Sequence, residues 1–339
     1  MTDTNGAFGP VEPTGGIDPA LDADADAPDF AEVEEPSGPK RPERIPIPDN
    51  DEKRARLVEN VRAALAALPN YFRSETNIEG LEAGDLFSLN SVLGGTIEVQ
   101  TVATLNRIRE VWDPDEEWAE YGFERSSQSF PDVRLVTRAE GHTSPVLGIE
   151  LKGWYLLSRE AEPSFRYTAT REASSPYDLL VVVPWRLSNI LSGTPYVYEP
   201  FVEQSMYAAD LRTFYWEGLR GEGSVVHPSG VRPYPAAKSA ISDKPVSDSG
   251  GNFGRVARVR GLMDDFVVEV LGRAVSGIPA RHWLNFFKTY TDNADSDAVN
   301  AAVVRALNVV KKPKEAERAA RIADTLRELG ALISGDPVK

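Results

Sequence analysis

The fold of this chain depends on two segments, Ser129-Phe-Pro-Asp-Val-Arg-Leu135 and Leu147-Gly-Ile-Glu-Leu-Lys-Gly-Trp-Tyr-Leu-Leu157. Both are short and mainly apolar, which is typical of strands, and we expect strands over residues 130–137 and 146–157. The turn-forming stretch 141–145 between them indicates a hairpin. A continuous apolar run over 178–184 predicts a further, buried strand. The sequence therefore predicts a small sheet in the middle of the chain.

Charged residues lie within these apolar strands. Asp132 is just inside the first strand. Glu150 and Lys152 are two apart on the second, so their side chains leave the same face of the sheet. The alternating Ile149 and Leu151 point the other way, into a core. Glu150 and Lys152 then either line a cleft or form a solvated pair.

A hairpin would bring Asp132 close to Glu150. Two adjacent carboxylates are unfavourable unless a proton or a cation lies between them, and Mg²⁺ is often held by one or two carboxylates together with substrate phosphate. Lys152 would lie beside such an ion, where it orients or deprotonates a water or stabilises charge that develops on phosphorus. The alternative is an ordinary salt bridge on a strand.

The pattern Pro131-Asp132, then Glu150-Leu151-Lys152, resembles that of the PD-(D/E)xK nuclease superfamily, and the chain as a whole resembles a type II restriction endonuclease of that superfamily. The preceding proline, a separation that fits one hairpin, the apolar strand setting and an upstream helix agree with this. The resemblance covers residues 85–185. It implies an α/β fold with a restriction-endonuclease-like core, a small mixed β-sheet flanked by helices, with additional helical and loop-rich segments.

The resemblance also implies roles for individual residues. Asp132 and Glu150 would be metal ligands, joined by the backbone carbonyl of Leu151, and Lys152 would be the catalytic lysine. Many members of the superfamily place a further glutamate on the helix before the sheet to help hold the metal, and Glu98 is the candidate here. The implied ion is Mg²⁺, for which Mn²⁺ can substitute.

The chain divides by composition into three stretches. Residues 1–48 are rich in Pro, Gly, Asp and Glu and hold almost no large aliphatic side chains, so we expect a disordered acidic tail. Residues 49–185 would contain N-terminal helices and the nuclease core. Residues 186–339 would continue the same domain with loop-rich and helical segments, and we expect them to supply DNA recognition and dimer contacts.

Helical spacing of apolar residues recurs outside the sheet. We expect helices over 51–68 and 85–112, the second with a break or a close backbone contact at Gly94 and Gly95. The other stretches with helix-like spacing are 255–274, 280–290 and 297–333.

The net charge of -15 comes mainly from the N-terminal stretch. Residues 1–50 hold twelve acidic and three basic side chains, or -9, which leaves -6 for the other 289 residues. A basic surface for DNA is compatible with this distribution. The absence of cysteine excludes disulfide scaffolds, cysteine nucleophiles, zinc ribbons and iron–sulfur clusters. Because no signal-like start and no membrane-length apolar run are present, we expect a soluble, cytoplasmic protein without membrane contact.

Five arginines are candidates for DNA contacts. Arg166 and Arg171 follow the second strand among aromatic residues, and Arg255, Arg258 and Arg260 form the densest positive cluster of the second half. Guanidinium groups bind phosphates in a bidentate manner and can read guanine edges. The alternatives are a polar loop for the first two and a charged helix face for the other three.

The sequence is compatible with three functions. The first is a Mg²⁺-dependent endonuclease that cuts specific double-stranded DNA sequences. It would be a homodimer, because two strands call for two active sites, and the resemblance implies a cognate DNA methyltransferase. The second keeps this chemistry in a repair or defence nuclease that recognises DNA structure or modification. The third is a non-catalytic binding protein in which Glu150 and Lys152 only pair on a strand.

Overall fold

The computed structural model describes residues 40–81, 85–126, 129–137, 145–219, 230–234, 241–244, 252–289, 297, 301 and 322–327. All of them belong to the unit Pro39–Lys339. Residues 1–38 form a separate unit, which lies outside the described residues.

Most helices precede or follow the strands rather than alternating with them. The helices are α1 (Glu52–Ala66), α2 (Leu68–Tyr71), α3 (Leu89–Arg107), α4 (Arg109–Trp112), α5 (Ser205–Phe214), α6 (Asp264–Gly272) and α7 (Ala280–Thr289). The strands are β1 (Tyr121–Arg125), β2 (Val133–Thr137), β3 (Leu147–Tyr155), β4 (Leu179–Leu187), β5 (Pro195–Val197), β6 (Phe201–Gln204), β7 (Ala274–Val275) and β8 (Ile278–Pro279). Single helical turns lie at Asp85–Ser88, Arg171–Ala173, Tyr215–Leu219 and Val256–Arg258. None of the described helices is both long and apolar enough to span a membrane.

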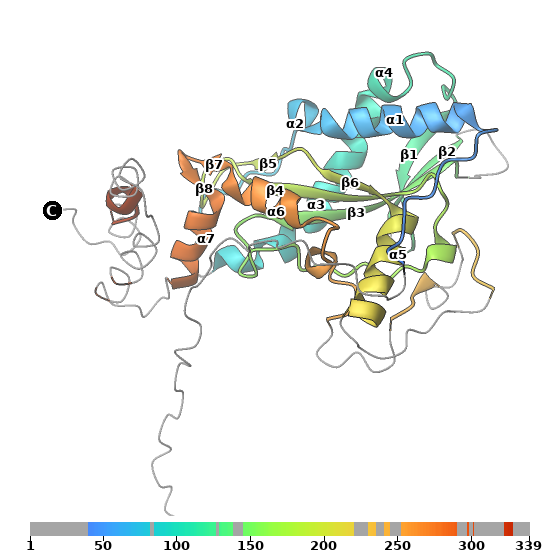
Figure 1. The fold of residues 1–339 in the computed structure, drawn as a ribbon. Helices are drawn as coiled ribbons and strands as arrows, with labels where there is room; N and C mark the ends of the chain where they lie inside the picture. Colours follow the sequence, from blue (N-terminus) through green and yellow to red (C-terminus); the bar gives the residue numbers. More distant parts are fainter. Residues whose placement is uncertain are drawn as a thin grey trace, which may run out of the picture. The chain divides into compact units, whose positions relative to one another are not determined.

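Six strands form one mixed sheet (Figure 1). β1, β2 and β3 pair antiparallel in chain order, and β4 runs parallel to β3, with Ile149–Tyr155 paired to Leu179–Trp185. β6 and β5 both pair antiparallel with β4, beside its first and last residues respectively. The pairing of β2 with β3 confirms that the two strands with the charged residues are neighbours. The turn predicted at 141–145 lies outside the described residues except for its last position.

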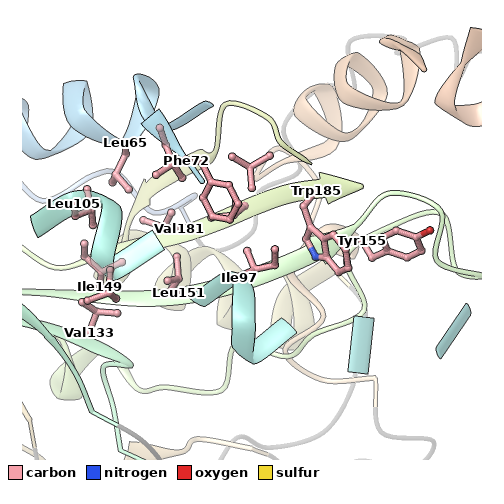
Figure 2. Close-up of a cluster of buried hydrophobic side chains, with 14 of the residues drawn as sticks. Leu65, Phe72, Ile97, Leu105, Val133, Ile149, Leu151, Tyr155, Val181 and Trp185 are labelled. Atoms are coloured by element: carbon pink, nitrogen blue, oxygen red, sulfur yellow. The ribbon is translucent and has the colours of Figure 1, made fainter. Parts of the chain in front are cut away.

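Different helices cover the two faces of the sheet. On one face, Leu151 of β3 and Val181 of β4 pack with Ile97 of α3 and with residues of α1 (Figure 2). On the other face, Leu180 packs with Leu211 and other residues of α5. Successive strand residues point to opposite faces, which explains the two separate cores. In Figure 1, α1 (blue) and α5 (yellow) lie on opposite sides of the strands. The expected α/β class, a mixed sheet flanked by helices, is confirmed.

Helix α1 begins and packs as its sequence predicts. The side chain of Asp51 accepts a hydrogen bond from the N–H of Arg54 at 3.2 Å, which caps one of the free donors of the first turn. Leu57, Val61 and Leu65 follow at four-residue spacing and are fully buried. This stripe fixes α1 over the sheet core.

Helix α3 runs without a break through Gly94 and Gly95. Of the two expectations for these glycines, the close backbone contact is the one found, and it involves Gly94. The Cα of Gly94 lies 3.8 Å from the point where a Cβ on Gly153 of β3 would lie. This is an ordinary van der Waals distance, and a Cβ on Gly94 would meet no atom within 4 Å, so the contact does not require glycine at either position.

The helix expected over 255–274 begins only at Asp264. Residues 255–260 hold a single 3₁₀ turn, after which Gly261 has a φ of +75°. Glycine adopts this conformation readily, and it separates the turn from α6. Before Asp264, the three-residue spacing of Val256 and Val259 resembles that of a helix. Both side chains are buried in the same core, although no α-helix forms there. The helix expected over 280–290 is confirmed by α7.

Residues 40–48, which we expected to belong to the acidic tail, include contacts with the folded unit. Arg44 forms an ion pair of 2.6 Å with the buried carboxylate of Glu203. Next to it, the backbone of Ile45 exchanges two hydrogen bonds with the side chain of Gln204. Residues 40–48 therefore belong to the folded unit, whereas residues 1–39 lie outside the described residues. Of the stretch 297–333, only 297, 301 and the helical residues 322–327 are described.

Candidate active site

The structure brings Asp132, Glu150 and Lys152 together on the α5 side of the sheet, at the start of β2. The antiparallel register pairs Val133 with Ile149. Asp132, the residue before Val133, therefore lies opposite Glu150, the residue after Ile149. Val133 and Ile149 are buried in the core on the α3 side. Alternation along each strand therefore places the three charged side chains on the other face.

Lys152 joins the two carboxylates. Its Nζ lies 2.7 Å from Oδ2 of Asp132 and 2.8 Å from Oε1 of Glu150. Backbone donors add to this network. The N–H of Leu151 donates to Oδ2 of Asp132 at 3.1 Å, and the N–H of Asp132 donates to Oε2 of Glu150 at 3.3 Å. Within the described residues, Oδ1 of Asp132 accepts no hydrogen bond, so this oxygen remains free for another ligand.

The cluster is largely withdrawn from solvent without being sealed. The exposed fractions of the side chains are 24% for Asp132, 20% for Lys152 and 12% for Glu150. Burial raises the pKa of Glu150 to about 7, while the charge of Lys152 opposes this rise. Burial lowers the pKa of Lys152, but the two carboxylates raise it by more, so the net direction is upward. Lys152 is therefore held as an ammonium.

The oxygens of this cluster suit a hard divalent cation. Asp132, Glu150 and Lys152 in their charged forms leave one net negative charge. The N–H and C=O of a strand residue point to the same side, so the carbonyl of Leu151 faces the side on which its N–H meets Asp132. No three His, Asp or Glu side chains are grouped as a metal site in the described part of the chain. Two carboxylates, a carbonyl, waters and substrate oxygens are nevertheless a usual environment for Mg²⁺.

Glu98 lies apart from this cluster. Its carboxylate pairs with Arg125 of β1 at 2.8 Å. Arg125 shares its face of the sheet with Phe123, which is buried in the core on the α3 side. The sheet therefore separates Glu98 from Glu150 and Lys152. The prediction that Glu98 helps to hold the metal has no support in this geometry, because α3 covers the opposite face.

The two predicted arginine groups lie next to each other. Arg166 and Arg255 form an isolated antiparallel bridge. The side chain of Arg255 pairs with Glu160 at 3.0 Å, and that of Arg258 pairs with Glu162 at 2.8 Å. These acidic partners offset part of the positive charge that a DNA surface would need.

The remaining two candidate arginines differ in setting. Arg171 pairs with Asp210 of α5 at 2.8 Å. Arg260 has an exposed side chain, just before Gly261. The alternative of a charged helix face for Arg255, Arg258 and Arg260 is not found, because residues 255–260 precede α6. The ion pairs of Arg171, Arg255 and Arg258 in the described residues are all with carboxylates outside the cluster of Asp132, Glu150 and Lys152.

A second polar group beside the cluster was not predicted. Oδ1 of Asp178 accepts hydrogen bonds from the N–H of Gly148 at 2.7 Å and from the hydroxyl of Tyr234 at 2.6 Å. Its Oδ2 accepts from the N–H of Ser175 at 2.7 Å. Burial raises the pKa of Asp178, and these hydrogen bonds lower it in part. The hydrogen bond between Asp178 and Tyr234 joins residues that are far apart along the chain, so the sequence holds no signal for it.

Arg134 lies on the same face of the sheet as Asp132. Its two-residue spacing from Asp132 on a strand is a signal that the sequence does contain.

No protein-family model and no curated protein matches this sequence.

Proposed function

We propose that this chain is a Mg²⁺-dependent endonuclease that hydrolyses phosphodiester bonds in DNA, with Asp132, Glu150 and Lys152 as its catalytic set. One observation carries the proposal. The three side chains meet where β2 begins beside β3, and the Nζ of Lys152 lies within 2.8 Å of both carboxylates. Carboxylates that can bind a divalent cation, next to a cation that can bind phosphate, are what metal-assisted phosphodiester hydrolysis requires.

The arrangement of the sheet supports the more specific proposal of a restriction-type nuclease. Antiparallel β1, β2 and β3, a parallel β4 and the preceding α3 agree with the small mixed sheet that the family resemblance implies. From this resemblance we infer that the substrate is a specific sequence in double-stranded DNA and that a cognate methyltransferase protects it. Two copies of the chain would act together, because each strand needs an active site.

Each residue of the cluster would have a separate task. Asp132, Glu150 and the carbonyl of Leu151 would hold Mg²⁺, which when bound supplies positive charge beside the phosphate and a more acidic water. The ammonium of Lys152 would donate to a non-bridging phosphate oxygen and stabilise the charge that develops during attack. A water oxygen would form a bond to phosphorus and lose a proton to solvent, the bond from phosphorus to the leaving oxygen would break, and that oxygen would take up a proton from solvent.

Metal binding should stabilise the folded protein through Asp132. At a Mg²⁺ concentration a hundred times the dissociation constant, the expected gain is about 2.7 kcal/mol, because the ion binds only the folded state. The melting temperature should rise by several degrees on adding Mg²⁺ or Mn²⁺, and the Asp132→Asn variant should lose this rise. An equal rise in both proteins would contradict a metal site at Asp132.

The Glu98→Gln variant should keep both the metal-dependent rise in melting temperature and cleavage, within about twofold of the wild-type protein. Its carboxylate pairs with Arg125 on the far face of the sheet, and partly exposed ion pairs contribute only about 1 kcal/mol or less to stability. Parallel melting and cleavage assays on Glu98→Gln and Asp132→Asn check this expectation. A loss of metal dependence in Glu98→Gln would return Glu98 to the metal site.

A second candidate function is a non-catalytic binding protein. The direct contact of Lys152 with both carboxylates favours it, since these three groups also satisfy one another as a closed salt bridge. Such a protein would show no metal-linked change in melting temperature that depends on Asp132. The melting experiment with Asp132→Asn therefore separates the two candidates.

A further inference from the structure

Arg134 lies on the same sheet face as the carboxylate cluster. It follows Asp132 by two positions on β2, a distance of about 7 Å along a strand, and its side chain leaves the same face. On β3 its partner in the register is Gly148. Lys152 and Arg134 therefore flank the pair Asp132 and Glu150 from opposite ends.

The guanidinium of Arg134 has only neutral partners in the described structure. Its Nη2 donates to the carbonyl of Phe130 at 2.9 Å and lies 3.4 Å from the hydroxyl of Ser129. Its Nε is enclosed and has no hydrogen-bond partner among the described residues. Other arginines, such as Arg125 and Arg258, pair with carboxylates. No carboxylate of the described residues pairs directly with the guanidinium of Arg134, so an anionic ligand could bind it through charge-assisted hydrogen bonds.

Tyr234 holds this guanidinium in place. The Cζ of Arg134 lies 5.5 Å from the centroid of the Tyr234 ring, within the range of cation–π attraction. The hydroxyl of Tyr234 is anchored to Asp178 at 2.6 Å. A Cβ at Gly148 would approach Cε1 of this ring to 3.1 Å, so the glycine leaves room for it. The orientation of Arg134 is therefore set by a fixed aromatic ring.

We propose that Arg134 binds a backbone phosphate of the DNA strand held at Asp132 and Glu150, and that Tyr234 acts as the positioning residue for Arg134. This inference rests on the proposed nuclease function, and it assigns a substrate contact to a residue outside the three-residue pattern. Guanidinium groups bind phosphate oxygens through charge-assisted hydrogen bonds. Such a contact fixes the position of the strand without reading its sequence.

The test measures DNA binding against salt concentration for the wild-type protein and three variants. A plasmid-derived duplex is bound in EDTA, where no cleavage occurs. Each phosphate contact contributes about 0.9 to the slope of log affinity against log salt for duplex DNA. Arg134→Met should lower the slope by about this amount and weaken binding about tenfold to a hundredfold. Arg134→Lys should restore the slope, because its charge remains. Arg125→Met, which removes one charge on the opposite face, should leave the slope unchanged.

The outcomes separate this inference from the proposed function. If the wild-type protein cuts and binds DNA while Arg134→Met keeps the wild-type slope, Arg134 has no phosphate contact and the nuclease proposal stands. A wild-type protein that neither cuts nor binds overturns both proposals. A purely structural role, such as holding the carbonyl of Phe130, would change the melting temperature but not the slope. Arg134→Lys keeps the comparison informative if Arg134→Met folds poorly.

Discussion

Replacing Lys152 by alanine should lower the rate of DNA cleavage by about 10²- to 10³-fold, the range seen when a donor that stabilises transition-state charge is removed. Lys152 is the one cation in contact with both Asp132 and Glu150 among the described residues, so no described side chain can replace it. The rate should be measured in single-turnover reactions with saturating Mg²⁺, where binding does not limit cleavage.

The matched control for this variant is Lys53→Ala. Lys53 lies on α1, donates to the carbonyl of Glu117 and stacks on Trp118, away from the cluster. Its removal should leave the rate within about twofold of the wild-type value, as expected for an exposed contact. Melting temperatures of both variants show that they are folded. A folded Lys152→Ala protein with an unchanged rate would remove Lys152 from the catalytic set.

Replacing Arg212 by methionine should lower the free energy of unfolding by about 3–5 kcal/mol, the usual loss when one partner of a buried ion pair is removed. Arg212 is fully buried and pairs with Asp243. It also donates to the carbonyls of Tyr167 and Ala169 at 2.9 and 2.8 Å. Methionine fills a similar volume, so the loss reports the missing charge and hydrogen bonds. Urea unfolding of the two proteins measures the difference.

Arg171→Met is the control for Arg212→Met. Arg171 pairs with Asp210 at 2.8 Å, but its side chain is 48% exposed. A pair in this setting contributes about 1 kcal/mol or less. If the two variants lost the same free energy of unfolding, the buried network around Arg212 would not be the stabilising feature that its burial indicates.

Much of the sheet could be predicted from local pattern alone. The apolar run before Pro184 is a central strand that is buried on both faces, and such strands read as continuous apolar segments. The strand character of β2 and β3 followed from the same kind of pattern. The strands β5 and β6 could not be predicted, because they are only three and four residues long and gain their order from pairing with β4. Short edge strands carry little periodicity of their own.

The centre of the site could be predicted because it depends on alternation within one strand. The same face for Glu150 and Lys152 follows from their spacing, and one hairpin brings Asp132 to them. The pairing of Glu98 with Arg125 could not be predicted, because helical spacing does not reveal which face of the sheet a helix will cover. Arg255 pairs with Glu160, which is far away along the chain. The sequence therefore indicated a cluster of arginines but not the carboxylate that pairs with Arg255.

The most direct test of the central claim is cleavage of unmethylated phage and plasmid DNA by the purified protein with Mg²⁺, beside reactions with EDTA and with the Lys152→Ala variant. A sequence-specific nuclease should give discrete fragments that are absent from both controls, and their ends would identify the recognition sequence. Cleavage confined to branched or modified DNA would assign the same cluster to a structure- or modification-dependent nuclease. If no duplex, modified or branched DNA is cut and the melting temperature is unchanged by metal, the nuclease account is contradicted and the Asp132, Glu150 and Lys152 cluster is a structural salt bridge.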